Sequence, residues 1–259
     1  MNIIFIGSGN VATHMAIALI ESEHNIIQVY SRTLENAEIL ANIVDADATD
    51  NLKMINDNAD LYIFSLKDDA IEQTISHMPQ TSGIWVHTAG SVPMEVFEQS
   101  KSKNKPYTGF GVIYPLQTFS KNKELNFFDV PVFIEGNTPE TSKILDEIAK
   151  SISNNVRYML NEKRCYLHLA AVFANNFSNH MFALAAEVLD DENIPFDVLK
   201  PLITETVAKV MEMNPQEAQT GPAVRFDESI IKKHNGLIKS GLTKEIYNLL
   251  SKSIHKNSI

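Results

Sequence analysis

The hydrophobic positions in the first part of the chain alternate between short continuous runs and amphipathic stretches. Residues 3–6 form a run of β-branched and aromatic side chains that ends at glycine, which is typical of a strand buried on both faces. Over residues 11–22 the apolar side chains recur at spacings of three and four, which predicts a helix. The cycle repeats, with strands predicted at 26–30, 61–65 and 84–88 and helices at 34–43 and 68–77. This alternation indicates parallel strands joined by crossover helices.

Two further strands are predicted at residues 130–134 and 156–160, on either side of a helix. Thr138 and Pro139 mark the start of that helix, because threonine caps a helix well and proline suits its first position. The alternation then stops. Residues 162–191 contain no Gly or Pro and carry apolar side chains at helical spacing, so they predict one helix of roughly eight turns. Further helices are predicted at 197–213, 227–239 and 243–254.

This pattern predicts an α/β protein of two domains. A doubly wound strand–helix domain over residues 1–160 precedes a smaller all-α domain over residues 161–259. With 259 residues, of which 44% are hydrophobic, the chain is long enough to bury a sizeable core. The apolar start lacks a preceding Lys or Arg and is interrupted after four residues, so we expect a mature N-terminus and not a signal peptide.

The net charge, the cysteine content and the positions of the histidines limit which partners and which metal or disulfide sites the protein can have. The net charge of −10 repels phosphate backbones and anionic lipid surfaces at long range. The lysines within residues 100–105 and at 232–233 are isolated pairs that we interpret as solvated surface, so neither a nucleic-acid nor a membrane partner is expected. A single cysteine, Cys165, excludes an intramolecular disulfide and a Cys-rich zinc site and fits a cytoplasmic protein. The histidines are scattered over different elements, and no metal site is expected.

The turn after the first strand has the spacing Gly-x-Gly-x-x-Ala and opens a helix. The first glycine permits a tight turn, the second lets a pyrophosphate approach the backbone, and Ala12 lets helix and strand pack closely. The helix N-terminus adds unpaired N–H groups and a positive dipole end, so an acidic protein can still bind an anion locally. The alternative is a tight turn in another kind of strand–helix domain. The predicted pyrophosphate-binding residues are Gly7, Ser8, Gly9, Asn10 and Val11.

The end of the second strand selects the cofactor. An acidic residue there binds the ribose 2′-OH of NAD, whereas Arg and hydroxyl groups suit the 2′-phosphate of NADP. The chain has Ser31, Arg32 and Thr33 at this position and no carboxylate, so we predict NADP; the alternative is that Arg32 is only a surface cation.

Other strand ends should line the same cleft, because ligands of doubly wound sheets lie beyond the carboxyl ends of the strands. We interpret His87 as a buried, hydrogen-bonded histidine in preference to a site residue. The further cofactor-binding residues predicted at these strand ends are Ser65, Leu66, Lys67 and Thr88.

These segments resemble a known family. Residues 3–12 and 30–33 resemble the NADP-binding domain of pyrroline-5-carboxylate reductases and of the wider β-hydroxyacid dehydrogenase superfamily. The chain is more similar to bacterial oxidoreductases in which a Rossmann-like domain is joined to a domain of unknown function, DUF2520. Four segments carry this similarity: 87–91, 115–119, 171–177 and 220–225. In that family a histidine often precedes Pro115, where this chain has Tyr114; Tyr114 must replace it as a donor, or activity is lost.

The resemblance implies that substrate lies between the nicotinamide and the first long helix of the second domain. On that helix His168 and Asn175 share a face at helical spacing, and Asn176 lies on the adjacent stripe. We interpret His168 as a general acid, because histidine can release a proton near neutral pH. Asn175 and Asn176 would orient the substrate. The alternatives are a surface or interface histidine and buried hydrogen bonds between helices.

Three further residues are assigned to the substrate. Thr220 and Arg225 lie on a loop shaped by Gly and Pro, and such a loop suits a substrate carboxylate; pairing of Arg225 with Asp227 is the alternative. Gln117 belongs to the segment 115–119 that carries the resemblance.

Together these features predict an NADP-dependent reductase that transfers hydride between the nicotinamide and a small carbonyl or imine acid. The alternative is a non-catalytic NADP-binding sensor or partner-binding protein on the same fold. The long helix is apolar around much of its circumference and needs more partners than three short helices supply. We therefore expect a homodimer through the helical domain.

Overall fold

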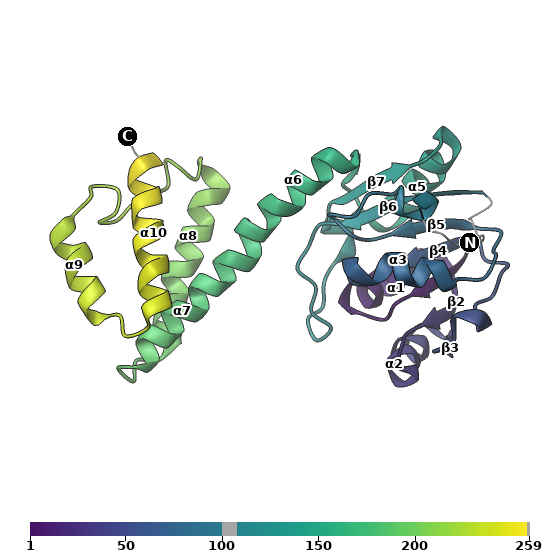
Figure 1. Cartoon of the computed structure of the whole chain (residues 1–259), viewed down its shortest axis with the longest axis horizontal. Helices are drawn as coiled ribbons and strands as arrows, with labels where there is room; N and C mark the ends of the chain where they lie inside the picture. Colours follow the sequence, from purple (N-terminus) through teal and green to yellow (C-terminus); the bar gives the residue numbers. More distant parts are fainter. Residues whose placement is uncertain (100–107, 258–259) are drawn as a thin grey trace. The chain divides into compact units, whose positions relative to one another are not determined.

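The computed structural model describes residues 1–99 and 108–257 (Figure 1). The lysines of residues 100–105 lie outside these ranges. Two compact units make up the chain, Met1–Asn175 and Asn176–Ile259. The division falls later than the expected boundary after residue 160, because the helix α6 (Asn161–Ala171) is fastened to the sheet of the first unit by Arg164.

The first unit is built on an eight-stranded sheet in the order β3-β2-β1-β4-β5-β6-β7-β8. The chain winds outward from β1 in both directions, so the predicted doubly wound Rossmann-like fold is confirmed. In such a sheet a ligand is expected where the order reverses, between β1 and β4, beyond the carboxyl ends of the strands. The strands are β1 (Asn2–Ile6), β2 (Asn25–Tyr30), β3 (Asp47–Thr49), β4 (Leu61–Phe64), β5 (Ile84–His87), β6 (Gly109–Pro115), β7 (Val132–Gly136) and β8 (Val156–Tyr158).

The sheet differs from the prediction in three ways. The strands β3 and β6 were not predicted, because β3 has only three residues and β6 contains Gly109 and Gly111, which are rare in strands. The sheet is also not wholly parallel, since β7 runs antiparallel to β6. An antiparallel neighbour needs no crossover helix, and here only the short helical turn η2 (Phe127–Asp129) lies between the two strands.

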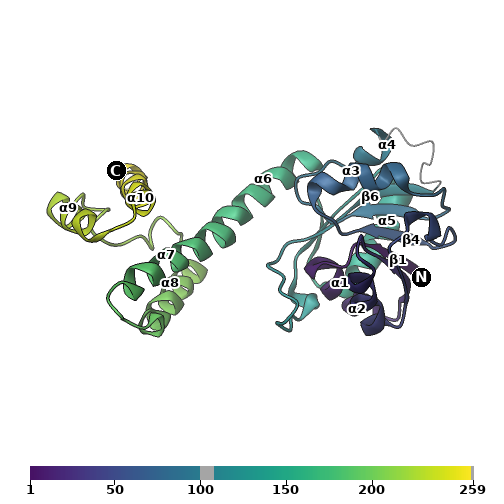
Figure 2. The same ribbon diagram turned by 60° about the horizontal axis from the view of Figure 1, so that its bottom comes forward.

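Helices cover both faces of this sheet. The first five helices are α1 (Asn10–Glu21), α2 (Leu34–Val44), α3 (Asp68–His77), α4 (Val96–Gln99) and α5 (Pro139–Ile152). Ile3 and Phe5 of β1 pack in a core with α1, α2 and α5, whereas Ile4 and Ile6 belong to a second core with α3 and α4. Figure 2 shows the sheet between these two groups of helices. The predicted cap of α5 is confirmed, since Thr138 Oγ1 accepts a hydrogen bond from the N–H of Thr141 at 3.1 Å.

The predicted long helix is a continuous helical stretch with an irregular turn inside it. The helix α6 is followed by a π-helical turn at Val172–Phe177 and then by α7 (Ser178–Asp190). π-Helical turns are rare and frequently lie at functional sites. The second unit continues with η4 (Phe196–Leu199), α8 (Lys200–Glu212), α9 (Glu228–Leu237) and α10 (Gly241–Asn257).

The second unit buries very little of its apolar surface. Among its described residues only Ala223 and Ser251 are buried, whereas Leu202, Met211 and Leu249 are between 63% and 81% exposed. A wholly apolar groove lies between α7 and α10. Exposed apolar area of this extent is unusual for an isolated domain. No helix in the described ranges is both long and apolar enough to span a membrane.

A buried ion pair joins α6 to the sheet. Arg164 is fully buried, and its Nη1 lies 2.5 Å from Oε2 of Glu135, which is 3% exposed. Its Nη2 donates to the carbonyl oxygen of Val92 at 2.7 Å and to Oδ1 of Asn161 at 3.1 Å. One side chain therefore joins β7, the segment after β5 and the first turn of α6.

Removing one member of this pair should destabilise the first unit. Arg164→Met leaves the Glu135 carboxylate buried without a counter-charge, so the free energy of unfolding should fall by about 3–5 kcal/mol. Urea unfolding followed by the fluorescence of Trp85 measures this, because Trp85 is the only tryptophan and is fully buried in the first unit.

The matched control is an exposed pair. Lys150 Nζ lies 2.6 Å from Asp146 Oδ2 on the surface of α5, so Lys150→Met should cost less than about 1 kcal/mol. Equal losses in the two variants would contradict a special contribution from the buried pair.

Candidate functional site

The glycine turn between β1 and α1 holds three strand ends together. Gly7 has a φ of +118°, and a Cβ at this position would lie 2.2 Å from the carbonyl oxygen of Ser65, just after β4. Its N–H donates to the carbonyl oxygen of Tyr30, at the end of β2, at 2.8 Å. Gly7 is thus required both by its backbone conformation and by the close approach of β4.

At Gly9 neither the backbone conformation nor a protein contact requires glycine. Its φ of −77° is ordinary, and a Cβ there would meet no protein atom within 4 Å. The first turn of α1 contains no acidic residue and no side-chain cap, so its N–H groups are open to an anion. Nothing in the protein excludes a Cβ at Gly9, and the open space beside it fits the approach of a pyrophosphate. The residues present therefore fit a dinucleotide.

A pocket of about 400 Å³ opens beside this turn. Its walls come from the start of α1, the segments that follow β4 and β5, the end of β6, and α6. The structure thus brings together many of the residues predicted for cofactor, substrate and catalysis: Gly9, Asn10, Val11, Ser65, Leu66, Lys67, Thr88, Gln117 and His168. The pocket also contains Asp68, which the sequence did not single out. Its other lining residues belong to the segments 87–91 and 115–119 that carry the family resemblance: Ala89, Gly90, Pro115 and Phe119.

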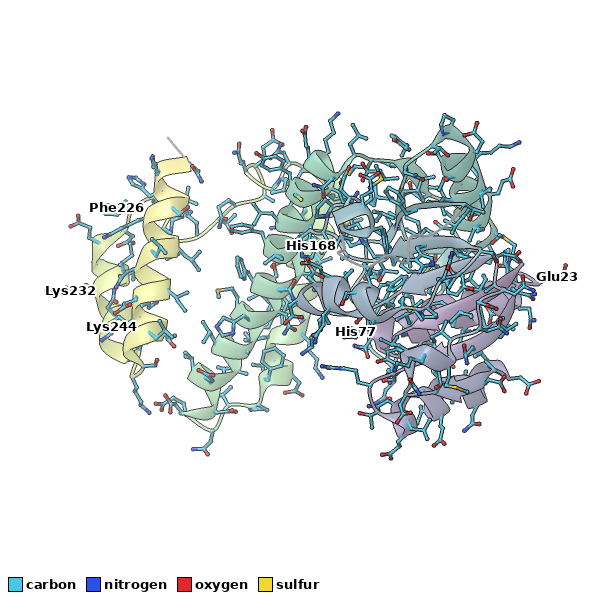
Figure 3. All side chains as sticks on the ribbon, turned by 45° about the vertical axis from the view of Figure 1, so that its right-hand side comes forward. Glu23, His77, His168, Phe226, Lys232 and Lys244 are labelled. Carbon is cyan, nitrogen blue, oxygen red and sulfur yellow. The ribbon has the colours of Figure 1, made fainter. Side chains whose placement is uncertain are left out.

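Tyr114 and His168 meet in the wall of this pocket. The Tyr114 hydroxyl lies 3.0 Å from His168 Nδ1, and the two rings are nearly perpendicular with centroids 6.0 Å apart. Gly90 leaves room for this contact, since a Cβ there would lie 2.7 Å from His168 Nδ1 and 2.8 Å from Tyr114 Cζ. Figure 3 shows His168 on α6, beside the sheet of the first unit.

Local charges act on the Tyr114 hydroxyl. Burial raises the pKa of Tyr114, and the Asp68 carboxylate raises it further, against a smaller opposing effect of Arg164. Asp68 itself accepts a hydrogen bond from the Ser91 hydroxyl. Because its pKa is raised, Tyr114 keeps its proton at neutral pH and can act as a hydrogen-bond donor.

His87 is structural, as the sequence interpretation proposed. It is fully buried, and its Nδ1 accepts a hydrogen bond from the N–H of Ala89 at 3.2 Å. Burial lowers the pKa of His87 to about 3, with a further lowering by the Arg164 charge. His87 is therefore neutral throughout the physiological range and exchanges no proton there.

The predicted 2′-phosphate segment follows β2, the strand beside β1. Arg32 and Thr33 are exposed, Ser31 is half-buried, and Arg32 makes no ion pair with any residue that the structure describes. Thr33 begins α2 but makes no side-chain capping bond. Ser8, in the glycine turn, is buried. These side chains do not line the pocket beside α1, and their roles stay predictions.

The remaining predicted residues lie later in the chain. Asn175 and Asn176 are exposed within the π-helical turn. Thr220 lies beside α8, and Arg225 is exposed in the turn before α9. Asp227 caps α9, and hydrogen bonds from Ser229 and Ile230 lower its pKa. The Arg225 charge lowers it further, although in the described part of the chain the two side chains form no close ion pair. The substrate roles of these four residues stay predictions.

The strand order and the glycine turn define a Rossmann-like fold. Residues 2–86 match the family model "NADP oxidoreductase coenzyme F420-dependent", and residues 130–254 match DUF2520. The chain is 46% identical to a putative NADP oxidoreductase from Bacteroides fragilis, over 98% of both chains, with a TM-score of 0.89. The chain belongs to this family of NADP oxidoreductases, in which a Rossmann-like domain is joined to DUF2520.

Two more distant structures share the fold. Pyrroline-5-carboxylate reductase from Streptococcus pyogenes is 16% identical, with a TM-score of 0.61 over 100% of this chain and 98% of that one. A reductive aminase from Aspergillus terreus, solved with NADPH and ethyl-5-oxohexanoate, is 14% identical, with a TM-score of 0.71 over 98% and 94%. None of the curated proteins compared with the sequence matches it.

Proposed function

We propose that the protein is an NADPH-dependent reductase that delivers hydride to a small carbonyl or imine acid. The observation that carries this proposal is a single pocket that joins the glycine turn to the Tyr114–His168 contact. One end of the pocket has the features of a pyrophosphate site, and the other offers polar donors. The reductive aminase of the same fold was solved with NADPH and a keto ester, which supports this class of chemistry.

The cofactor end rests on the glycine turn and on the segment after β2. In this proposal Gly7 to Val11 hold the pyrophosphate, and Ser31, Arg32 and Thr33 bind the 2′-phosphate. The side chains of Ser65, Leu66, Lys67 and Thr88 line the cleft where the strands end. NADPH, when bound, supplies the hydride.

The substrate end rests on α6 and the residues that follow it. His168 donates to the carbonyl oxygen or imine nitrogen as that atom gains electron density. Gln117, which lines the pocket, and Asn175 orient the substrate. Asn176, Thr220 and Arg225 belong to the second unit, and their substrate roles stay predictions from the sequence.

Binding of the two nicotinamide nucleotides tests the cofactor. The wild-type protein should bind NADPH more tightly than NADH in calorimetric titration. Arg32→Ala should weaken NADPH binding about tenfold to hundredfold and leave NADH binding unchanged, because the variant lacks the cation that pairs with the 2′-phosphate. Gly9→Ala should weaken both, because its Cβ projects into the space that the pyrophosphate needs.

Arg157→Ala is the matched control, since Arg157 is also exposed but lies on β8, at the far edge of the sheet. An Arg32→Ala variant that keeps its preference for NADPH would rule out the proposed 2′-phosphate site. Wild-type protein that binds neither nucleotide would end the reductase proposal.

Turnover tests the chemistry. With a panel of small 2-keto and imino acids, the wild-type protein should consume NADPH. The loss of absorbance of the reduced nicotinamide measures this consumption. His168→Ala should lower kcat/KM about 10²–10⁴-fold without weakening NADPH binding, because it removes the donor to the reacting atom. His77→Ala, an exposed histidine on α3, should change neither. Tight NADPH binding without turnover of any acid would instead favour the non-catalytic sensor.

We propose that the protein forms a homodimer through its helical unit. Its exposed apolar side chains and its apolar groove suit a second copy of the chain, as obligate dimer interfaces resemble a domain core cut in half. Sedimentation velocity should show a dimer, and Met211→Glu with Leu249→Glu should yield monomers. Lys252→Glu, which also changes a charge on α10, should leave the dimer intact. A wild-type monomer at micromolar concentration would contradict this prediction.

A further inference from the structure

We propose that Tyr114 is a positioning residue, which holds the ring of His168 with Nδ1 as acceptor and Nε2–H directed to the pocket. The substrate end of the site then presents a hydrogen-bond donor whether His168 is neutral or protonated. The catalytic consequence rests on the proposed reductase function, but the tautomer and orientation of His168 do not. Such a donor suits a carbonyl oxygen or an unprotonated imine nitrogen, because both have a lone pair that can accept.

The position of Tyr114 is fixed by packing. Tyr114 is 7% exposed, and its ring lies in a small apolar cluster with Val112 and Phe133, against which Leu167 of α6 also packs. Its hydroxyl reaches Nδ1 of His168 at 3.0 Å. His168 is only partly buried, and both residues line the pocket. The hydroxyl therefore acts as a fixed point against which a more exposed ring is oriented.

The backbone of His168 is fixed as well. Arg164 lies four residues earlier, one turn away on the same face of α6, and is tied to Glu135 and Val92. Gly90 lies close to both rings and has no side chain to separate them. The imidazole of His168 can then still rotate about the bond that joins the ring to Cβ, and the Tyr114 hydroxyl restrains this rotation.

The direction of the hydrogen bond follows from the groups around it. Burial and the Asp68 carboxylate, at the start of α3, both raise the pKa of Tyr114, so the hydroxyl keeps its proton. The Arg164 charge on α6 opposes this shift but is paired with Glu135 of β7. A neutral imidazole that accepts a hydrogen bond at Nδ1 carries its proton on Nε2. When His168 gains a second proton, Nδ1–H donates to the Tyr114 oxygen and Nε2–H is retained.

Nitrogen NMR of the full-length protein tests the tautomer directly. The histidines are labelled with ¹⁵N, and the signals of His168 are assigned as those that are missing in His168→Ala. Neutral His168 should be a single Nε2–H tautomer with a hydrogen-bonded Nδ1. In Tyr114→Phe the ring should become a mixture of tautomers. An Nδ1–H tautomer in the wild type, or spectra that Tyr114→Phe leaves unchanged, would overturn the proposal.

The kinetic effect should be specific to turnover. Tyr114→Phe should lower kcat about tenfold, with KM and NADPH binding nearly unchanged, because the donor is present but less well oriented. An unchanged kcat, or a raised KM with weaker NADPH binding, would contradict the positioning role.

Tyr62→Phe is the matched control for loss of a buried tyrosine hydroxyl. Tyr62 is fully buried, and its hydroxyl donates to the carbonyl oxygen of Asn56 at 2.8 Å, away from the pocket. It should change stability without changing the His168 spectrum. If the tautomer is locked by Tyr114 but no acid is reduced, the reductase proposal fails and the positioning role of Tyr114 stands.

Discussion

A single buried cation, Arg164, determines where His168 of the candidate site lies. Arg164 lies without solvent contact among Glu135, Val92 and Asn161, and a charge in such a place is tolerated only with a counter-charge, which Glu135 supplies. Because its partners belong to β7, to the segment after β5 and to α6, the pairing requires these three elements to meet. His168 follows one turn later on the same helix and is thereby brought to the strand ends. The buried ion pair of Arg164 thus holds α6 against the sheet, and this contact brings His168 to the pocket.

Much of the nucleotide end could be predicted from the sequence, because the constraints on it are local. Gly7 has a positive φ and lies against the carbonyl oxygen of Ser65, and only glycine satisfies both constraints. The sequence shows this directly, as a glycine at the end of an apolar run. The alternation of strands and helices likewise predicted the doubly wound sheet, although not its strand order or the short strand β3.

The substrate end could not be derived in the same way. Gly109 and Gly111 made β6 look unlike a strand, so the importance of Tyr114 at its end was visible only through a family resemblance. The contact between Tyr114 and His168 joins residues 54 positions apart and depends on Gly90 in a third segment. The pairing of Arg164 with Glu135 is likewise long-range, and it moves the boundary of the first unit into the long helix. Local periodicity carries no information about such contacts.

The π-helical turn that begins at Val172 changes what helical spacing means for the residues on either side of its start. An α-helix advances about 100° per residue, and at that pitch His168 and Asn175 share one face. The π-helical turn begins between them, and its hydrogen bonds span five residues in place of four, so each residue within it advances by a smaller angle. The stripe of α6 that contains His168 is therefore not continued in phase to Asn175. The irregular turn acts as a phase offset, which separates the amide of Asn175 from the helical stripe of the imidazole.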